Sequence, residues 1–137
     1  MSATAGYSGT PLVRKLGLQP GMAVQVIDAP APYGDIVDGL PADLRIVSRA
    51  SASTRFVHVF AREAARLRRT LVALRDKLPT DATVWVSWPK KASGVATDIS
   101  ENTVRELALP LGFVDVKVCA IDATWSGLKL VVRRALR

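Results

Sequence analysis

A buried strand followed at once by an amphipathic helix stands in the middle of the sequence. Phe56–Phe60 (FVHVF) is apolar at every position except His58, which is typical of a central strand covered on both faces. From 61 to 78 the apolar residues recur at steps of three and four, which predicts a helix with one buried stripe: Ala64, Leu67, Leu71, Leu74 and Leu78. A strand coupled to a helix in this way is the unit of α/β folds with parallel sheets.

The same alternation extends to both sides of this unit. Further strands are predicted at residues 22–28, 44–47, 83–88, 114–122 and 128–134, and further helices at 10–16, 35–40 and 98–108. Thr10 is the expected cap of the first helix, and Asp98 with Glu101 resembles a capping box. In the strand at 114–122, Val114, Val116 and Val118 alternate with polar residues and predict one buried face.

The link between the last two strands, Ala123–Gly127, is too short for a parallel return, so these strands are expected to pair antiparallel. The sequence therefore predicts a Rossmann-like three-layer α/β sandwich, with a mostly parallel sheet of about six strands and a C-terminal antiparallel hairpin. We expect one domain over 1–137, with 1–8 as a flexible N-terminal tail.

Composition bears on how this domain is stabilised and on where it is expected in the cell. With 137 residues, 49% of them hydrophobic, the chain can bury a core without disulfides or a structural metal. Its one cysteine, Cys119, lies in a predicted strand and is expected to be a buried, unreactive thiol. The sequence shows no leader pattern and no apolar run of membrane-spanning length, so the expected location is cytoplasmic.

The chain is basic, with a net charge of +7. Such a charge attracts nucleic acids or phosphorylated ligands without specificity. The long helix carries cations opposite its apolar stripe, namely Arg62, Arg66, Arg69 and Lys77. Because no aromatic residues are interleaved with them, a solvated outer face is the preferred interpretation.

The parallel sheet that ends in an antiparallel hairpin resembles the class I methyltransferase architecture, in a shorter form that lacks one strand–helix unit after the second strand. Four stretches also resemble a small bacterial family, typical of actinobacteria, known as a domain of unknown function. They are YSGTPL at 7–12, WVSWPKKASG at 85–94, VDVKVCA at 114–120 and WSGLK at 125–129. The resemblance implies a Rossmann-like fold and supplies no catalytic residue, because fold alone does not carry function.

The cofactor motif of methyltransferases is incomplete. Asp28 stands after the first strand, but the following segment APAPYG has prolines where glycines are expected, and proline has no N–H to donate. The second strand ends in Val47, Ser48 and Arg49, without the acid that binds ribose hydroxyls. No cofactor is assigned; S-adenosylmethionine or a nucleotide stays open, and Arg49 offers a cation for a phosphate.

In open α/β sheets, ligands bind beyond the carboxyl ends of the strands. The segments expected there are 28–34, Arg62 with its neighbours, 89–94 and 122–127. The candidate ligand-binding residues are Asp28, Tyr33, Lys90, Lys91, Ser93, Asp122, Trp125 and Ser126. Two lysines and an aromatic face are suited to a flat, anionic ligand. The competing interpretation is that the prolines and Trp125 are structural and that the lysines are solvated.

No catalytic or metal site can be proposed from spacing. His58 is the only histidine and lies within a predicted strand, so a buried, hydrogen-bonded imidazole is preferred over a catalytic base. Ser87 and Ser93 lack a nucleophile-elbow pattern.

Three hypotheses of function remain. The preferred one is a non-catalytic module that binds an anionic small molecule or a protein partner at the carboxyl edge of the sheet. The alternatives are a divergent S-adenosylmethionine-dependent, methyltransferase-like enzyme and a basic protein associated with nucleic acid.

Overall fold

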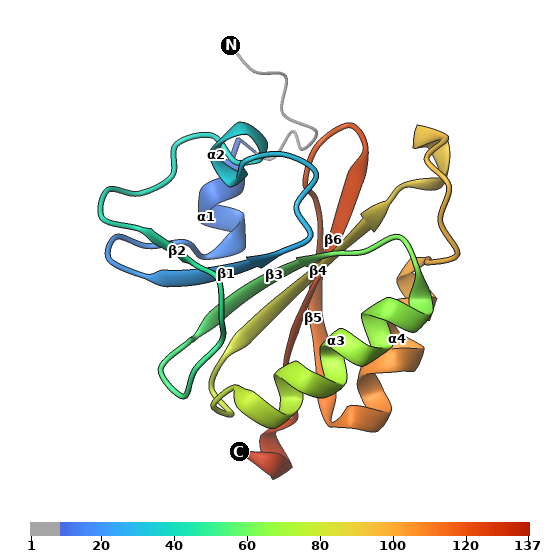
Figure 1. Ribbon diagram of the computed structural model, residues 1–137. Coiled ribbons are helices and arrows are strands. Elements are labelled where there is room, and N and C mark those ends of the chain that lie inside the picture. Colours follow the sequence, from blue (N-terminus) through green and yellow to red (C-terminus); the bar gives the residue numbers. More distant parts are fainter. Residues whose placement is uncertain (1–8) are drawn as a thin grey trace.

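The computed structural model describes residues 9–137, which form a six-stranded sheet in the order β2-β1-β3-β4-β6-β5 (Figure 1). Neighbouring strands from β2 to β4 pair in parallel, whereas β6 pairs antiparallel with both β4 and β5. The strands are β1 (Ala23–Ile27), β2 (Arg45–Val47), β3 (Phe56–Phe60), β4 (Thr83–Pro89), β5 (Phe113–Ala120) and β6 (Trp125–Val132). The predicted sheet with its C-terminal hairpin is confirmed. The tail predicted at 1–8, which includes Tyr7 and Ser8 of the first family-like stretch, lies outside the described residues.

Helices lie on both faces of this sheet, which gives three layers. On one face pack α1 (Leu12–Leu16) and α2 (Tyr33–Ile36), and on the other α3 (Ala64–Lys77) and α4 (Glu101–Ala108). Three single 3₁₀ turns complete the chain: η1 (Lys91–Ser93), η2 (Leu109–Leu111) and η3 (Arg134–Leu136). None of the helices in residues 9–137 has the length and apolar character needed to cross a membrane.

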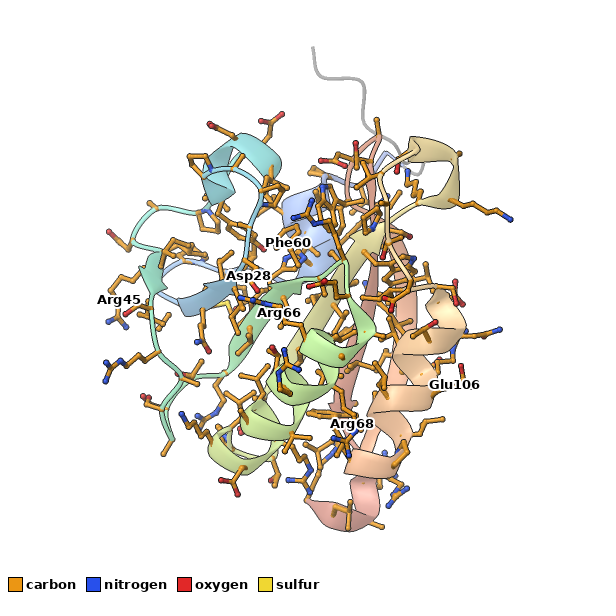
Figure 2. The ribbon with its side chains drawn as sticks, turned by 45° about the vertical axis from the view of Figure 1, so that its right-hand side comes forward. Asp28, Arg45, Phe60, Arg66, Arg68 and Glu106 are labelled. Atoms are coloured by element: carbon orange, nitrogen blue, oxygen red, sulfur yellow. The ribbon has the colours of Figure 1, made fainter. Side chains whose placement is uncertain are left out.

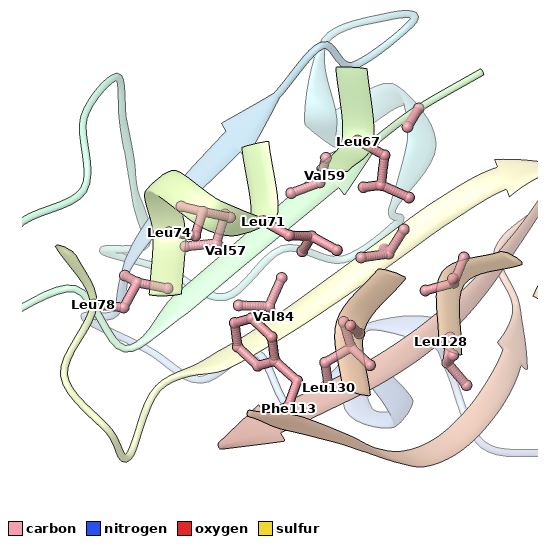
Figure 3. Packing of buried hydrophobic residues seen from close by; sticks show 14 of the residues in the cluster. Val57, Val59, Leu67, Leu71, Leu74, Leu78, Val84, Phe113, Leu128 and Leu130 are labelled. Carbon is pink, nitrogen blue, oxygen red and sulfur yellow. The ribbon is translucent and has the colours of Figure 1, made fainter. Parts of the chain in front are cut away.

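The stripe predicted on the long helix forms the core between α3 and the sheet (Figure 3). Leu67 and Leu71 are fully buried and pack with Val57 and Val59 of β3. Burying a leucine of this kind contributes about 2 kcal/mol of hydrophobic stabilisation. Because β3 is buried at every position, the expectation of a central strand is confirmed.

The opposite face of β3 packs under α1 and α2. Phe56 and Phe60 lie there with Trp85 of β4. The indole Nε1 of Trp85 donates to the carbonyl of Leu16 at 3.0 Å, which satisfies a carbonyl at the end of α1. This buried hydrogen bond holds the short α1 against the sheet.

The caps predicted for two helices are wrong. The capping box of α4 is formed by Ser100 and Thr103. The Ser100 hydroxyl accepts from the backbone N–H of Thr103, and the Thr103 hydroxyl accepts from the backbone N–H of Ser100. Asp98 instead accepts from the backbone N–H of Ala64 at 2.7 Å, at the start of α3. For α1 the N-cap position is Pro11, one residue after the predicted Thr10.

The alternation predicted for β5 is also wrong. Val116 and Val118 are 52% and 46% exposed, and Val114 is only half-buried. β5 is the edge strand, and its pairing with β6 shifts register between Asp115 and Lys117. An irregularity of this kind breaks the period of two on which the prediction depended. Cys119 is buried as predicted, and burial raises the pKa of its thiol, with Lys15 and Lys117 partly opposing.

Candidate functional site

The end of β1 is joined to α3 by a bidentate ion pair. Asp28 follows the strand in the left-handed backbone region, with φ of 57°. Its carboxylate accepts from Arg66, at 2.9 Å from Nε to Oδ2 and 3.1 Å from Nη2 to Oδ1. Figure 2 shows the two side chains directed toward one another. The hydrogen bonds and charge of Asp28 raise the pKa of the Arg66 guanidinium.

A cavity of about 710 Å³ opens beside this pair, at the carboxyl ends of β1 and β3. It is lined by residues 28–30, residues 60–63, and Arg66, Val95, Thr124 and Trp125. The volume lies in the usual range for small-molecule sites. The segments after β1 and β3 and the β5–β6 link meet here, as the position of the carboxyl edge predicts.

Both signs of charge line this cavity. Asp28 and Arg66 are engaged with each other, whereas Glu63 and Arg62 are exposed. The backbone of Arg62 is held in place, because its carbonyl accepts from Thr97 Oγ1 at 2.7 Å and from the backbone N–H of Asp98 at 3.2 Å. Within residues 9–137 the Arg62 guanidinium makes no hydrogen bond or ion pair, so it can bind an anionic group.

An aromatic column leads from this cavity into the core. Trp125 meets Phe60 edge to face at 5.3 Å between ring centroids, and Phe60 stacks on His58 at 4.3 Å. Trp125 and Phe60 line the cavity although each is less than a tenth exposed. Together they give the cavity a rigid apolar wall, which Trp125 exposes more than Phe60 does.

Below this wall lies a buried polar chain of three residues. His58 Nδ1 is 2.7 Å from the Tyr33 hydroxyl, and His58 Nε2 is 2.7 Å from Ser87 Oγ. Burial lowers the pKa of His58 to about 3 and raises the pKa of Tyr33 above its usual range. His58 and Ser87 are fully buried and line none of the cavity, so the predicted buried, hydrogen-bonded imidazole is confirmed.

The predicted lysines are not among the residues that line the cavity. Lys90 Nζ donates to the carbonyl of Asp122 at 2.7 Å, and the Lys90 backbone N–H donates to the carbonyl of Thr124 at 2.7 Å. Ser93 Oγ closes the turn by donating to the carbonyl of Lys90 at 2.6 Å. Lys91 is exposed in η1. These contacts join the β4–α4 connection to the β5–β6 link.

The Asp122 carboxylate shapes that link. Its Oδ1 accepts from the backbone N–H groups of Thr124 and Trp125, at 2.8 and 2.7 Å. Ser126 is half-buried within β6 and pairs with Trp88. Of the eight predicted residues, Asp28 and Trp125 line the cavity, and Lys90, Ser93 and Asp122 meet outside its lining. Tyr33, Lys91 and Ser126 lie apart from both groups.

Sequence reasoning did not select Phe60, Arg62, Glu63 and Arg66 as individual site residues. Phe60 to Glu63 had a signal, because they end or follow a strand predicted to point at this edge. Arg66 had none, since its partner Asp28 is 38 positions away in the sequence. The predicted solvated face of α3 is exposed as expected, but Arg66 is paired, and Arg69 and Lys77 line a second cavity.

The residues at this edge do not fit S-adenosylmethionine in the mode usual for the methyltransferase fold. Pro30 and Pro32 lack the N–H groups with which a glycine-rich turn approaches the cofactor. The Asp28 carboxylate is engaged by Arg66, and β2 is followed by Ser48 and Arg49 instead of an acid. Across residues 9–137, no group of three or more His, Cys, Asp or Glu side chains is arranged to hold a metal ion.

No family model matches the chain, and no curated protein matches it. Solved structures do match. A SAM-dependent methyltransferase from Aquifex aeolicus aligns with a TM-score of 0.66 and 12% identity, over 88% of this chain and 87% of that one. A tRNA methyltransferase from Bacillus subtilis aligns with a TM-score of 0.56 and 10% identity, over 90% and 66% of the two chains.

The magnesium protoporphyrin IX methyltransferase of Synechocystis, solved with bound SAM, gives a TM-score of 0.54 and 12% identity, over 82% of this chain and 71% of that one. At such identities the likeness shows the fold alone. The chain has the Rossmann-like fold of class I SAM-dependent methyltransferases.

Proposed function

We propose that this chain is a binding module whose edge cavity holds a small molecule with a flat ring and an anionic group. The observation that carries the proposal is the unpaired Arg62 guanidinium beside the wall formed by Phe60 and Trp125. In this arrangement the ring packs on the aromatic wall while the anionic group binds Arg62.

The charge pattern of the cavity supports binding. The Asp28–Arg66 pair ties the cavity floor to α3, so the lining is already organised before a ligand enters. The buried His58, with its pKa lowered to about 3, lies behind Phe60 and is not offered to a ligand as a proton acceptor.

A divergent methyltransferase-like activity is the second candidate, and the observation that favours it is the fold. The Aquifex aeolicus SAM-dependent methyltransferase has nearly the same extent as this chain. S-adenosylmethionine also belongs to the proposed ligand class, since it carries a flat adenine and a carboxylate. Its binding here would require contacts other than the usual glycine-rich turn.

A thermal-shift screen separates these candidates. The panel holds S-adenosylmethionine, S-adenosylhomocysteine, adenine and nicotinamide nucleotides, and inorganic phosphate, because ligands that bind the native state raise the melting temperature by mass action. A dose-dependent shift with nucleotides but not with S-adenosylmethionine supports the binding module. A shift with S-adenosylmethionine favours the enzyme, and no shift favours a protein partner or nucleic acid.

Arg62→Gln tests the cavity directly. Losing a charge-assisted hydrogen bond is expected to weaken binding of any active compound roughly tenfold. Arg68→Gln is the matched control, because Arg68 is exposed on α3, six residues after Arg62, and lines neither this cavity nor the second one. Equal weakening by both variants would mean that net charge rather than the cavity governs binding, as for a protein that binds any polyanion.

A further inference from the structure

A second cavity, of about 600 Å³, lies on the α3 side of the sheet beside β1. Its walls are β1, residues 48–50 after β2, and the outer side of α3 between Arg69 and Lys77. It shares no lining residue with the edge cavity. Figure 1 shows why there is room, since α3 and α4 lie over β3, β4 and β6, and no helix lies over β1 and β2 on this face.

Gln25 is the polar residue at the bottom of this cavity. It interrupts the apolar run of β1 and is only 8% exposed. Its Nε2 donates to the carbonyl of Ser48 at 3.4 Å, which orients the amide. Its Oε1 has no partner, and it is the one buried side-chain nitrogen or oxygen in residues 9–137 left in that state. A buried acceptor without a donor is costly and rare in native proteins, so it points to a missing partner.

Three cations line the same cavity as Gln25. Arg49 follows β2, and Arg69 and Lys77 come from α3. Among the described residues none of the three forms an ion pair. Three unpaired cations from two separate elements, around one cavity, are suited to a multiply charged anion such as a phosphate monoester.

Part of the remaining lining is apolar. Ala50, Ala73 and Leu74 line it, and Leu74 belongs to the core under α3. A ligand made only of charge would leave both this wall and Gln25 Oε1 without a partner. The lining therefore favours a molecule with a phosphate at one end and a ring bearing an N–H or O–H donor at the other.

We propose that this cavity is a second binding site, for a phosphorylated small molecule of the nucleoside monophosphate class. The phosphate binds Arg49, Arg69 and Lys77. The base or sugar packs on Ala50, Ala73 and Leu74 and donates a hydrogen bond to Gln25 Oε1. The same chemistry occurs at the phosphorylated end of an RNA strand, but the two sources differ in size and the test separates them.

The experiment is a titration followed by amide NMR on the whole chain, labelled with ¹⁵N. The probes are AMP, GMP, CMP and UMP, sulfate as an anion with no donor, and a 5′-phosphorylated adenosine pentanucleotide. We expect at least one mononucleotide to shift the amides of residues 25, 48–50 and 69–77 and to compete with the pentanucleotide. No shift there with any mononucleotide, or binding of the pentanucleotide alone, overturns the proposal.

Variants assign the contacts. Arg69→Gln and Gln25→Leu are each expected to weaken the mononucleotide roughly tenfold, by losing one hydrogen bond. Gln25→Leu should leave sulfate affinity unchanged, because sulfate offers Oε1 no donor. Arg68→Gln, next to Arg69 and outside the cavity, and Arg62→Gln in the edge cavity should change nothing at these amides. Equal weakening by Arg68→Gln and Arg69→Gln, or full affinity in Gln25→Leu, overturns the site.

Discussion

The face of the sheet turned toward α3 has two halves that differ in cover. Over β3, β4 and β6, α3 and α4 bury apolar side chains such as Val59, Val84 and Leu128 to 1% exposure or less. Over β1 and β2 there is no helix, and residues 48–55 return the chain to β3 without regular structure. In the covered half the positions that pack in this core are apolar. In the open half Gln25 is buried and shares a cavity with three exposed cations.

β1 shows the contrast within one strand. Val24 faces α1 and α2 and is fully buried, whereas its neighbour Gln25 faces the open half. A part of the sheet that no helix covers can therefore still bury a side chain. A recess remains, deep enough to bury an amide yet open to a ligand.

The largest change in the free energy of unfolding is expected for a substitution in the covered half. Leu71→Ala is expected to lower the free energy of unfolding by about 3–4 kcal/mol, because Leu71 is fully buried and leaves a cavity that helix and sheet cannot close. Urea denaturation followed by circular dichroism measures this. Val72→Ala, one residue along α3 and 41% exposed, is the matched control, with a cost of about 0.5 kcal/mol or less. Similar losses in both variants would mean that α3 does not seal this half.

The next prediction concerns how stability depends on pH through His58, on the other face of β3. Burial lowers the pKa of His58 to about 3, so between that value and the ordinary histidine pKa the unfolded chain binds a proton that the native chain does not. Stability contributed by neutral His58 is therefore complete above about pH 6.5 and falls as the pH drops, at up to ~1.4 kcal/mol per pH unit.

His58→Gln retains a donor and an acceptor but cannot titrate. Between about pH 6.5 and 4.5 we expect the wild type to lose roughly 2 kcal/mol more unfolding free energy than this variant. Urea denaturation at a series of pH values gives both slopes. Parallel slopes would show that His58 is not held neutral in the Tyr33–His58–Ser87 chain.

The sequence was sufficient for what periodicity and chain length control. The strand 56–60 and the stripe from Leu67 to Leu78 were predicted because a covered strand and a packed helix repeat their apolar residues regularly. The strand at 114–122 was also predicted, but its buried face was not, since the register shift of β5 at Asp115 and Lys117 breaks the alternation. Periodicity thus predicts which residues are buried where strands and helices pack regularly, and it fails in an edge strand whose register shifts.

The sequence predicted the sheet edge at which the cavity opens and two of its lining residues, but not the contacts of the polar side chains. Parallel topology was enough to bring the ends of β1 and β3 together around Asp28 and Trp125. Whether each polar side chain is available to a ligand depends on its partner in the folded chain. Lys90 is occupied by the carbonyl of Asp122 and Asp28 by Arg66, and neither pairing has a sequence signal. Gln25 did have one, as the polar residue inside an apolar strand.

The smallest predicted effect on stability has the opposite sign, because it concerns the buried polar residue of the open half. In ligand-free protein, Gln25→Leu is expected to raise the free energy of unfolding by about 1 kcal/mol, because it removes a buried acceptor that has no donor. The long bond to Ser48 that it also removes is weak, and Ser48 is exposed, so water can replace it. Ser87→Ala, on the other face of the sheet, is the matched control and should destabilise, since it leaves His58 Nε2 without its partner. If Gln25→Leu destabilised the protein as Ser87→Ala does, Oε1 would already be satisfied in the ligand-free state, and the open half would be a finished surface rather than one that keeps an acceptor for a ligand.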